Sequence, residues 1–339
     1  MTARSLIIQT SFLGDTVLTT PLIAELAERG SVDVVVTPAS AALLAHNPAI
    51  ENLIVYDKRG RDRGVGGFVR TVRRLRANRY ATAYMAQASV RSGALVAAAG
   101  IPERVGYETS AGRRFYTRRV PYIENEHHAA RLLRLAGVDA DASRLRPRLY
   151  PGHEERAAVD GLLRDAGAAD EELIALAPGS VWATKRWPYY AELAGELDAR
   201  VVIIGAAADR ALADAIMQRA GAHTIDATGK LSLLASAELI SRSRAIVTND
   251  SSPLHLASAM GTPTVAIFGP TVPEFGFGPL APRSIVLGHT SLACRPCDRH
   301  GPQRCPLGHW RCMREITPRE VAAAVQNLLA QPRVPTSSR

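Results

Sequence analysis

The sequence predicts an α/β protein of two domains, each built on a mostly parallel sheet with helices on both faces. Short apolar segments alternate with segments of helical spacing along both halves of the chain, which is the pattern of βαβ units. The 339 residues exceed what one hydrophobic core usually holds. A less regular, proline-bearing stretch at 146–152 lies near the middle. We therefore expect two Rossmann-like domains, 1–150 and 151–330.

The first half contains candidate strands rich in branched aliphatic and aromatic residues, separated by candidate helices. The strands are expected at 6–9, 32–37, 53–56, 81–85 and 104–107. The helices are expected at 16–29, 40–47, 68–78 and 91–100. A further helix at 154–167 follows the proline-bearing stretch, so the domain boundary is placed before it.

The second half repeats this design. Its strands are expected at 173–178, 200–205, 223–226, 245–248 and 264–268. Between the last two, Ser252 is a suitable N-cap, Pro253 suits the first helical position and Gly261 ends the helix. This short helix therefore has boundaries that residue chemistry fixes.

The C-terminal end is expected to form one more helix and a tail. Thr317 and Glu320 have the spacing of a capping box, which opens an apolar-periodic helix at 321–329. The remaining residues, 331–339, are expected to be disordered.

Composition excludes several classes of protein. With 47% hydrophobic and 22% charged residues, the chain has the composition of a soluble globular protein. No apolar run approaches the roughly 20 residues that a membrane span needs. The N-terminal segment is too short and too soon interrupted by Gly14 and Asp15 for an export signal. We expect a cytoplasmic chain.

The net charge of +9 lies entirely in the first half. Residues 1–150 hold 22 basic and 13 acidic residues, whereas the rest holds 19 of each. An anionic partner, or a membrane surface carrying anionic lipid, is the physical expectation. Nucleic acid is disfavoured because no aromatic residues interleave with the basic run. The alternative is a solvated basic face without a partner.

One turn gathers the polar residues that an α/β protein uses to hold phosphate. Asp250, Ser251 and Ser252 lie between a strand and the N-terminus of the short helix, where free N–H groups and the helix dipole attract an anion. Asp250 suits sugar hydroxyls, and His255 lies one turn further along. The alternative is an ordinary capped crossover.

Three other turns after predicted strands carry residues suited to chemistry. Asp15 begins the first helix and could take a proton from a hydroxyl or cap the helix. Gly179 and Ser180 resemble a phosphate-binding turn, and Lys185 supplies a cation for a leaving diphosphate; a surface loop is the alternative. Asp209 follows another strand and could contact a nucleoside or merely end the turn.

These turns together carry a family resemblance. The motifs are Ser11-Phe-Leu-Gly-Asp15 with Thr19-Thr-Pro21, Pro178-Gly-Ser-Val-Trp-Ala-Thr-Lys-Arg-Trp-Pro188, and Thr248-Asn-Asp-Ser-Ser-Pro-Leu-His255 with Phe268-Gly-Pro270. They resemble the ADP-heptose:lipopolysaccharide heptosyltransferases of glycosyltransferase family 9 over nearly the whole chain. The Lys-Arg-Trp-Pro segment is more similar to the heptosyltransferase II branch than to the I branch.

The resemblance implies a GT-B fold, in which two Rossmann-like domains face each other across a cleft. It implies that residues 1–150 bind the acceptor and residues 151–330 bind ADP-heptose. No divalent metal or other cofactor is implied for catalysis. The implied partners are ADP-heptose, an anionic lipopolysaccharide-core acceptor and the inner leaflet of the cytoplasmic membrane, where the enzyme would be peripheral.

Site residues follow from the resemblance position by position. Asp15 matches the proposed general base, and Lys185 would stabilise the leaving ADP. The donor-binding positions are Gly179, Ser180, Lys185, Asp209, Leu231 near the adenine, Asp250, Ser251, Ser252 and His255. Ser252 stands where many relatives have glycine. The acceptor-binding candidates are Arg59, Arg61, Arg63, Arg113 and Arg114. The implied reaction is a direct displacement with inversion at the anomeric carbon.

All cysteines lie in one segment, as Cys294, Cys297, Cys305 and Cys312. Their spacing, C-x2-C-x7-C-x6-C, is typical of a structural zinc site with four thiolate ligands, for which His300 and His309 are substitutes. Reduced thiols, an iron–sulfur cluster and disulfides are the alternatives. A metal here would pin the loop near the donor site without taking part in transfer.

Other functions remain open at this stage. A transferase that uses another nucleotide sugar on a glycolipid shares every motif. A nucleotide-binding oxidoreductase would need a G-x-G-x-x-G turn, and the first strand instead runs into Ser11-Phe-Leu-Gly-Asp15. A non-catalytic sugar-nucleotide-binding protein is the third alternative, against which Asp15 argues.

Overall fold

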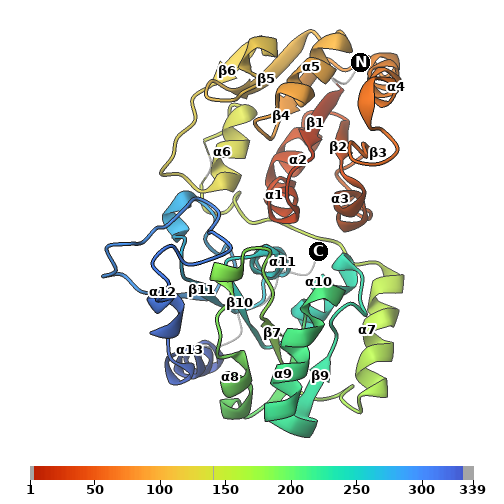
Figure 1. The fold of residues 1–339 in the computed structure, drawn as a ribbon. Coiled ribbons are helices and arrows are strands. Elements are labelled where there is room, and N and C mark those ends of the chain that lie inside the picture. Colours follow the sequence, from red (N-terminus) through yellow and green to blue (C-terminus); the bar gives the residue numbers. More distant parts are fainter. Residues whose placement is uncertain (1–3, 140, 331–339) are drawn as a thin grey trace. The chain divides into compact units, whose positions relative to one another are not determined.

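The structure is a computed structural model that describes residues 4–139 and 141–330. The tail expected at 331–339 lies outside the described residues. The chain divides into two compact units, Met1–Tyr150 and Pro151–Arg339, here called unit 1 and unit 2. Figure 1 shows each unit as a sheet with helices around it.

Unit 1 contains a six-stranded parallel sheet with the order β3-β2-β1-β4-β5-β6. Its central strands are buried and strongly apolar, because helices cover both faces of a parallel sheet. The strands are β1 (Ser5–Gln9), β2 (Val32–Val36), β3 (Asn52–Val55), β4 (Thr82–Met85), β5 (Glu103–Tyr107) and β6 (Arg118–Val120).

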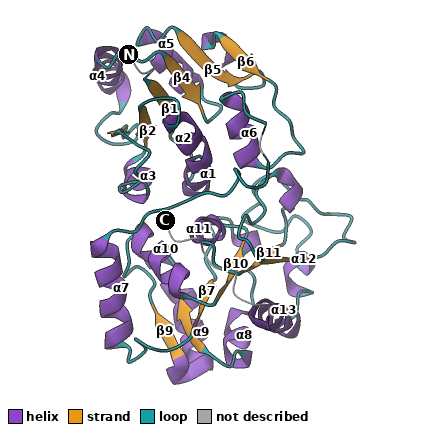
Figure 2. Cartoon of the chain, turned by 180° about the vertical axis from the view of Figure 1, so that it is seen from behind, coloured by secondary structure: helices purple, strands orange, loops and turns teal. Residues whose placement is uncertain are grey.

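The helices of unit 1 form two layers. The first layer contains α1, α2 and α6, which contact one another, together with α3, which contacts α1. The second layer contains α4 packed on α5. Both views show the sheet between helices (Figures 1 and 2). The helices are α1 (Leu13–Leu18), α2 (Thr20–Ala27), α3 (Pro38–Leu43), α4 (Gly64–Ala77), α5 (Val90–Ala98) and α6 (His128–Leu135).

Unit 2 repeats this arrangement with the parallel order β12-β11-β10-β7-β8-β9. Four of its strands are buried along their whole length, whereas β12 is a partly exposed edge strand. The strands are β7 (Leu173–Ala177), β8 (Arg200–Ile203), β9 (Thr224–Asp226), β10 (Ala245–Asn249), β11 (Thr264–Phe268) and β12 (Ser284–Gly288).

The helices of unit 2 also pack in two groups. Helix α8 contacts α9 and α13, and α10 contacts α7 and α11. The helices are α7 (His153–Asp165), α8 (Tyr190–Glu196), α9 (Arg210–Ala220), α10 (Leu233–Arg242), α11 (Ser252–Met260), α12 (Arg311–Arg314) and α13 (Pro318–Ala330). The expected N-cap Ser252 is instead the first helical residue of α11, and Ser251 occupies the N-cap.

Each sheet reverses its strand order at one point, between β1 and β4 in unit 1 and between β7 and β10 in unit 2. All strands in a sheet are parallel, so the loops that follow them leave from one edge. In open α/β sheets, ligands bind outside the carboxyl ends of the strands at such a reversal. The fold therefore predicts ligand binding at the loops after β1 and β4 and at the loops after β7 and β10.

Candidate active site

At the reversal in unit 2, the side chain of Asn249 joins the loops after β7 and β10. This fully buried amide donates from Nδ2 to the carbonyl oxygen of Pro178 at 2.9 Å. Its Oδ1 accepts hydrogen bonds from the backbone N–H of Trp187 at 3.1 Å and from the hydroxyl of Tyr190 at 3.2 Å. Asn249 thus fixes the segment that carries Lys185 relative to the end of β10.

Lys185 and Asp250 form an ion pair at this position. The Lys185 ammonium donates to Oδ2 of Asp250 at 2.6 Å, and about nine-tenths of each side chain is buried. The hydroxyl of Thr271, from the loop after β11, donates to the same oxygen at 2.7 Å. Two residues that the sequence analysis selected from separate motifs therefore meet, and the carboxylate is stabilised by a cation and a hydroxyl.

The N-terminus of α11 lies directly beside this pair, since Asp250 precedes the N-cap residue Ser251. Within the described residues, the buried Ser251 hydroxyl has no hydrogen-bond partner, and no side chain caps the helix. A helix N-terminus with free N–H groups and an unpaired hydroxyl is suited to an anion. His255 is buried within the same helix, where its ring packs edge-on against Phe277.

Gly179 and Asp209 approach each other closely at the ends of β7 and β8. A Cβ atom at Gly179 would lie 2.5 Å from the Asp209 carboxyl group, so only glycine allows this approach. The carboxylate accepts a hydrogen bond from the N–H of Ala206 at 2.9 Å, which stabilises the turn before α9. Asp209 therefore ends a turn, as in the simpler interpretation, and also borders the candidate phosphate turn.

Two further candidates for binding the donor substrate lie at the same edge of the sheet. The Ser180 hydroxyl accepts a hydrogen bond from the N–H of Trp182 at 3.2 Å, which holds the turn after β7 in shape. Leu231 lies partly buried in the loop after β9, one residue before Ser232, the N-cap of α10. Both positions follow the carboxyl ends of strands.

In unit 1, the turn after β1 leads into α1 and places Asp15 in the first turn of that helix. The N-cap is Phe12, so N-capping is not the role of Asp15. The carbonyl oxygen of Asp15 accepts a hydrogen bond from the hydroxyl of Thr19 at 2.7 Å, where α1 ends and α2 begins. Asp15 is thus held at the carboxyl edge of the sheet, next to the strand reversal.

Lys58 belongs to this turn as well, although the sequence analysis did not select it. Its ammonium donates to the carbonyl oxygen of Thr10 at 2.8 Å and to the Thr10 hydroxyl at 3.2 Å. Gln87, after β4, exchanges two further hydrogen bonds with Thr10. Partial burial, followed by the charges of Arg59 and Arg91, lowers the pKa of Lys58.

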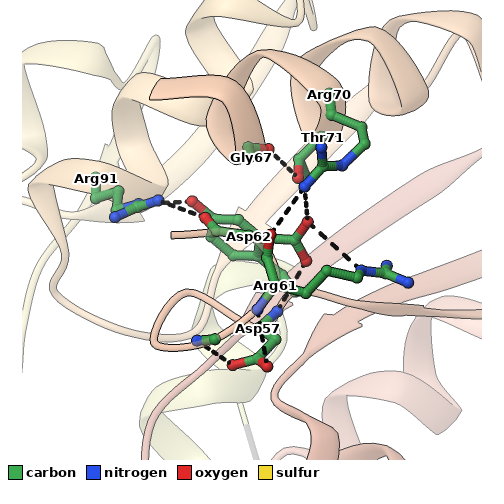
Figure 3. Close-up of polar contacts among 9 residues, drawn as sticks. Asp57, Arg61, Asp62, Gly67, Arg70, Thr71 and Arg91 are labelled. Atoms are coloured by element: carbon green, nitrogen blue, oxygen red, sulfur yellow. Dashed lines mark hydrogen bonds and ion pairs between the residues drawn. The ribbon is translucent and has the colours of Figure 1, made fainter. Parts of the chain in front are cut away.

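Two carboxylates hold the basic loop that follows β3 (Figure 3). Asp57 accepts hydrogen bonds from the N–H groups of Gly60 and Arg61 at 2.9 and 3.2 Å. The buried Asp62 accepts one from the N–H of Asp57 at 3.1 Å and pairs with Arg70 at 2.9 Å. Burial opposes ionisation of Asp62, but these hydrogen bonds and the charges of Arg61 and Arg70 lower its pKa overall.

The acceptor candidates are exposed on the loops after β3 and β5. Arg59, Arg61 and Arg63 extend from the loop held by the two carboxylates. Arg113 and Arg114 lie on a short 3-10 turn that packs against α5. All five follow carboxyl ends of strands of unit 1, on the same edge of the sheet as the turn with Asp15.

Comparison with known proteins identifies the family. The model of glycosyltransferase family 9 (heptosyltransferase) matches residues 68–308. The chain belongs to glycosyltransferase family 9. It is 28% identical to lipopolysaccharide heptosyltransferase 1 of Pseudomonas aeruginosa, over 97% of this chain and 99% of that protein.

Two solved structures extend the similarity to the fold. A family 9 glycosyltransferase from Veillonella parvula has a TM-score of 0.86 at 25% identity, covering 96% of this chain and 97% of that one. The E. coli ADP-heptose lipopolysaccharide heptosyltransferase II has a TM-score of 0.77 at 27% identity, covering 96% and 98%. The predicted α/β class with two Rossmann-like sheets is confirmed as the GT-B fold, and the chain is a glycosyltransferase.

The four cysteines for which a zinc site was expected lie in one segment of unit 2 of this glycosyltransferase. Cys294, Cys297, Cys305 and Cys312 are free thiols. Within the described ranges, no group of three or more His, Cys, Asp or Glu side chains is placed to hold a metal ion. Cys294 approaches His309 at 3.8 Å, between Sγ and Nε2.

The thiols nevertheless lie in different electrostatic environments. Burial, followed by the nearby Cys297 and Cys305, raises the pKa of Cys312 to about 11. Burial acts in the same direction on Cys305, but hydrogen bonds from the N–H groups of residues 307–310 outweigh it and lower the pKa of that thiol. Backbone N–H donors on a sulfur stabilise its thiolate form, which is the form that binds metals.

Proposed function

We propose that this glycosyltransferase transfers heptose from ADP-heptose to the inner core of a lipopolysaccharide precursor, with inversion at the anomeric carbon. Family membership supports glycosyl transfer, and the names of its relatives support heptose and lipopolysaccharide. The relatives include a type 1 enzyme and a type II enzyme. We assign the chain to the type II branch on its Lys185-Arg-Trp-Pro188 segment.

The observation that carries the proposal is the contact of Lys185 and Asp250 beside the N-terminus of α11. The ion pair measures 2.6 Å, it is nine-tenths buried, and the unpaired Ser251 hydroxyl lies next to it in sequence. A diphosphate needs a cation and free N–H donors, whereas a sugar hydroxyl needs a carboxylate acceptor. Lys185, Asp250 and the N-terminus of α11 supply these groups at one place.

The chemistry follows from these groups. Asp15 takes the proton of an acceptor hydroxyl, the oxygen attacks the anomeric carbon of the heptose, and the bond to ADP breaks. Lys185 and the N-terminus of α11 stabilise the negative charge that develops on the diphosphate. The remaining donor contacts come from Gly179, Ser180, Asp209, Leu231 and His255. No step needs a divalent cation.

The acceptor is proposed to bind to unit 1. Arg59, Arg61, Arg63, Arg113 and Arg114 are exposed at the edge that carries Asp15, and an inner-core precursor bears phosphate and carboxylate groups that pair with arginine. We propose that the same arginines hold the enzyme peripherally at the cytoplasmic face of the membrane. No described helix has the length and apolar character to cross a bilayer.

We also propose a structural zinc ion at the four cysteines. The donor set suits zinc, and the backbone N–H donors around Cys305 favour a thiolate, although the sulfurs are not gathered at ligand positions within the described residues. Protein purified without added zinc is expected to contain stoichiometric zinc by elemental analysis, and Cys305→Ser is expected to reduce it. Metal-free protein with four titratable thiols would contradict this proposal.

Replacement of Asp15 tests the mechanism. With ADP-heptose and a defined core acceptor, Asp15→Asn is expected to lower kcat by about 100-fold to 10,000-fold, because the amide cannot accept the proton. The affinity for ADP should be unchanged. Asp165→Asn, which removes an exposed carboxylate from α7, is the matched control. Full activity of Asp15→Asn would exclude the proposed base.

Donor choice distinguishes the second candidate function. A transferase for another nucleotide sugar would contain the same turns, so ADP-heptose should be assayed beside ADP-glucose and UDP-glucose with the same acceptor. Transfer from ADP-heptose alone supports the proposal. Binding of ADP without transfer from any donor would instead indicate a non-catalytic sugar-nucleotide-binding protein.

A further inference from the structure

Residues 300–303, here called the strap, cross over the segment that carries Lys185. The carbonyl oxygen of Pro302 accepts hydrogen bonds from both the N–H and the hydroxyl of Thr184. Gln303 makes two more bonds with this segment. Its Oε1 accepts from the N–H of Ala183 at 3.2 Å, and its Nε2 donates to the carbonyl oxygen of Val181 at 2.9 Å. The strap is thus hydrogen-bonded to three residues of this segment, Val181, Ala183 and Thr184.

Gly301 packs directly on the stem of Lys185. A Cβ atom at Gly301 would lie 3.3 Å from both Cγ and Cε of that lysine, and 3.2 Å from Cγ of Pro270. Its φ of +85° is in the left-handed region that glycine adopts without strain. A side chain at this position would therefore press on the stem of Lys185 and on Pro270, whereas glycine does not.

This contact matters because a lysine stem has four rotatable carbons and does not orient its own ammonium group. The Lys185 side chain is nine-tenths buried, and its far end is fixed by Asp250 at 2.6 Å. Along its length, the stem is bounded by Gly301. The strap also stacks His300 on Trp182, with the ring centroids 6.1 Å apart.

We infer that Gly301 and Gln303 are positioning residues that set the Lys185 ammonium for the donor diphosphate. This inference rests on the proposed function, in which Lys185 meets that diphosphate. The strap contributes no charged group to the ion pair between Lys185 and Asp250. It acts through the segment at 181–185, which it holds by hydrogen bonds, and through the stem on which it packs.

The test is Gly301→Ala, measured by direct binding of ADP and of AMP. A methyl group at this position pushes the stem aside, so the affinity for ADP should fall about tenfold, the size of one weakened charge-assisted hydrogen bond. AMP lacks the second phosphate, and its affinity should change much less. A general loss of structure would lower the affinities for ADP and for AMP equally, and that outcome would contradict the inference.

Gly221→Ala is the matched control. Gly221 also has a positive φ, of +69°, but a Cβ atom there meets nothing within 4 Å. It lies between α9 and β9, at the opposite edge of the sheet from the site. Both variants place a side chain at a positive φ, so the control should lose stability without losing the preference for ADP over AMP.

A double-mutant cycle with Lys185→Met shows whether the strap acts through the lysine. In the Lys185→Met background, Gly301→Ala should have no further effect on ADP affinity. Additive losses would overturn the inference. If Gly301→Ala does not fold, Gln303→Ala replaces it in the cycle, since Gln303 is exposed and does not carry the glycine conformation.

Failure of the inference and failure of the proposed function give different results. If the unaltered enzyme does not bind ADP, the proposed function fails, and the inference that rests on it fails with it. If it binds ADP, and Gly301→Ala and Gln303→Ala bind it equally well, the proposed function stands and the strap does not position Lys185.

Discussion

At the scale of single residues, variants of the Lys185–Asp250 pair should affect the stability of the fold and the transfer activity differently. Removing one partner of a buried ion pair leaves the other charge uncompensated, so Lys185→Met should lower the free energy of unfolding by about 3 kcal/mol. Replacing both partners, as in Lys185→Met with Asp250→Asn, should restore most of that loss, because no charge then remains buried. Urea unfolding measures both variants.

Activity should respond differently. The double variant has lost the cation and the carboxylate, so transfer from ADP-heptose should stay at the level of Lys185→Met despite the recovered stability. Activity that recovers together with stability would mean that the pair only holds the loop after β7 in place. Exposed Lys230→Met, whose ammonium lies 3.7 Å from Asp226, is a control for loss of a lysine.

The sequence singled out Lys185 and Asp250 but did not predict the contact between them. Asp250 and Lys185 were recognised because each stands in a motif of distinctive composition. Their ion pair joins positions 65 residues apart, and no local pattern encodes it. Asn249 and Thr271 were missed for a related reason, since a buried amide and a hydroxyl read as ordinary residues of a strand end and a loop.

At the scale of elements, the loop after β3 depends on the carboxylate of Asp62. Asp62→Asn keeps the shape of the side chain but weakens the hydrogen bonds from Arg70 and from the N–H of Asp57. This should lower the free energy of unfolding by about 1 kcal/mol. The loop then holds its arginines less firmly, so KM for the acceptor should rise while KM for ADP-heptose stays constant. Asp160→Asn, which removes an exposed partner of Arg242 in unit 2, is the control.

The pH dependence of stability has a defined sign for this loop. The pKa of Asp62 is lowered on folding from its ordinary value of 3.8, so its contribution to stability is complete above that value. The contribution is lost as the pH falls through the lower pKa of the folded state. The difference in unfolding free energy between the wild type and Asp62→Asn should therefore narrow from about pH 5 downward. A difference that does not vary over this range would mean that folding does not lower the pKa of Asp62.

Strands and helices were predictable where the sequence pattern matched burial. Strands β1, β2, β4, β7, β8, β10 and β11 are largely buried, mostly apolar runs of the kind that periodicity detects. The shorter apolar stretches in β3, β5 and β9 were enough to predict those strands as well. Strand β6 is a short Arg-Arg-Val edge, and β12 is half exposed, so neither has that signal. The single helix expected at 16–29 is two helices, because Pro21 near the N-terminus of α2 starts a new one at Thr20.

At the scale of the whole molecule, the charge of the chain divides between the units. Unit 1 has nine more basic than acidic residues, and unit 2 is neutral. Composition alone predicts an anionic partner, but it does not say which surface meets it. In the folded unit 1, the side chains of Arg59, Arg61 and Arg63 are exposed on one loop, and this exposure cannot be read from the pattern of charges.

Binding to vesicles tests whether the excess positive charge of unit 1 binds a membrane surface. The enzyme should bind vesicles containing anionic phospholipid and ignore neutral ones, and salt should weaken the binding because it screens exposed charges. Each basic residue near an anionic surface contributes about 1 kcal/mol, so reversal of Arg59, Arg61 and Arg63 to Glu should lower vesicle affinity about 100-fold or more.

The matched control reverses Arg164, Arg219 and Arg319, which are exposed on unit 2 and change the net charge equally. Net charge alone would make the two triple variants behave alike, and that result would remove unit 1 as the contact. If only the first variant loses vesicle binding but both keep the same acceptor KM, the arginines bind the membrane rather than the acceptor. Loss of vesicle binding together with a raised acceptor KM is the expected result, because both partners present phosphate groups to one loop.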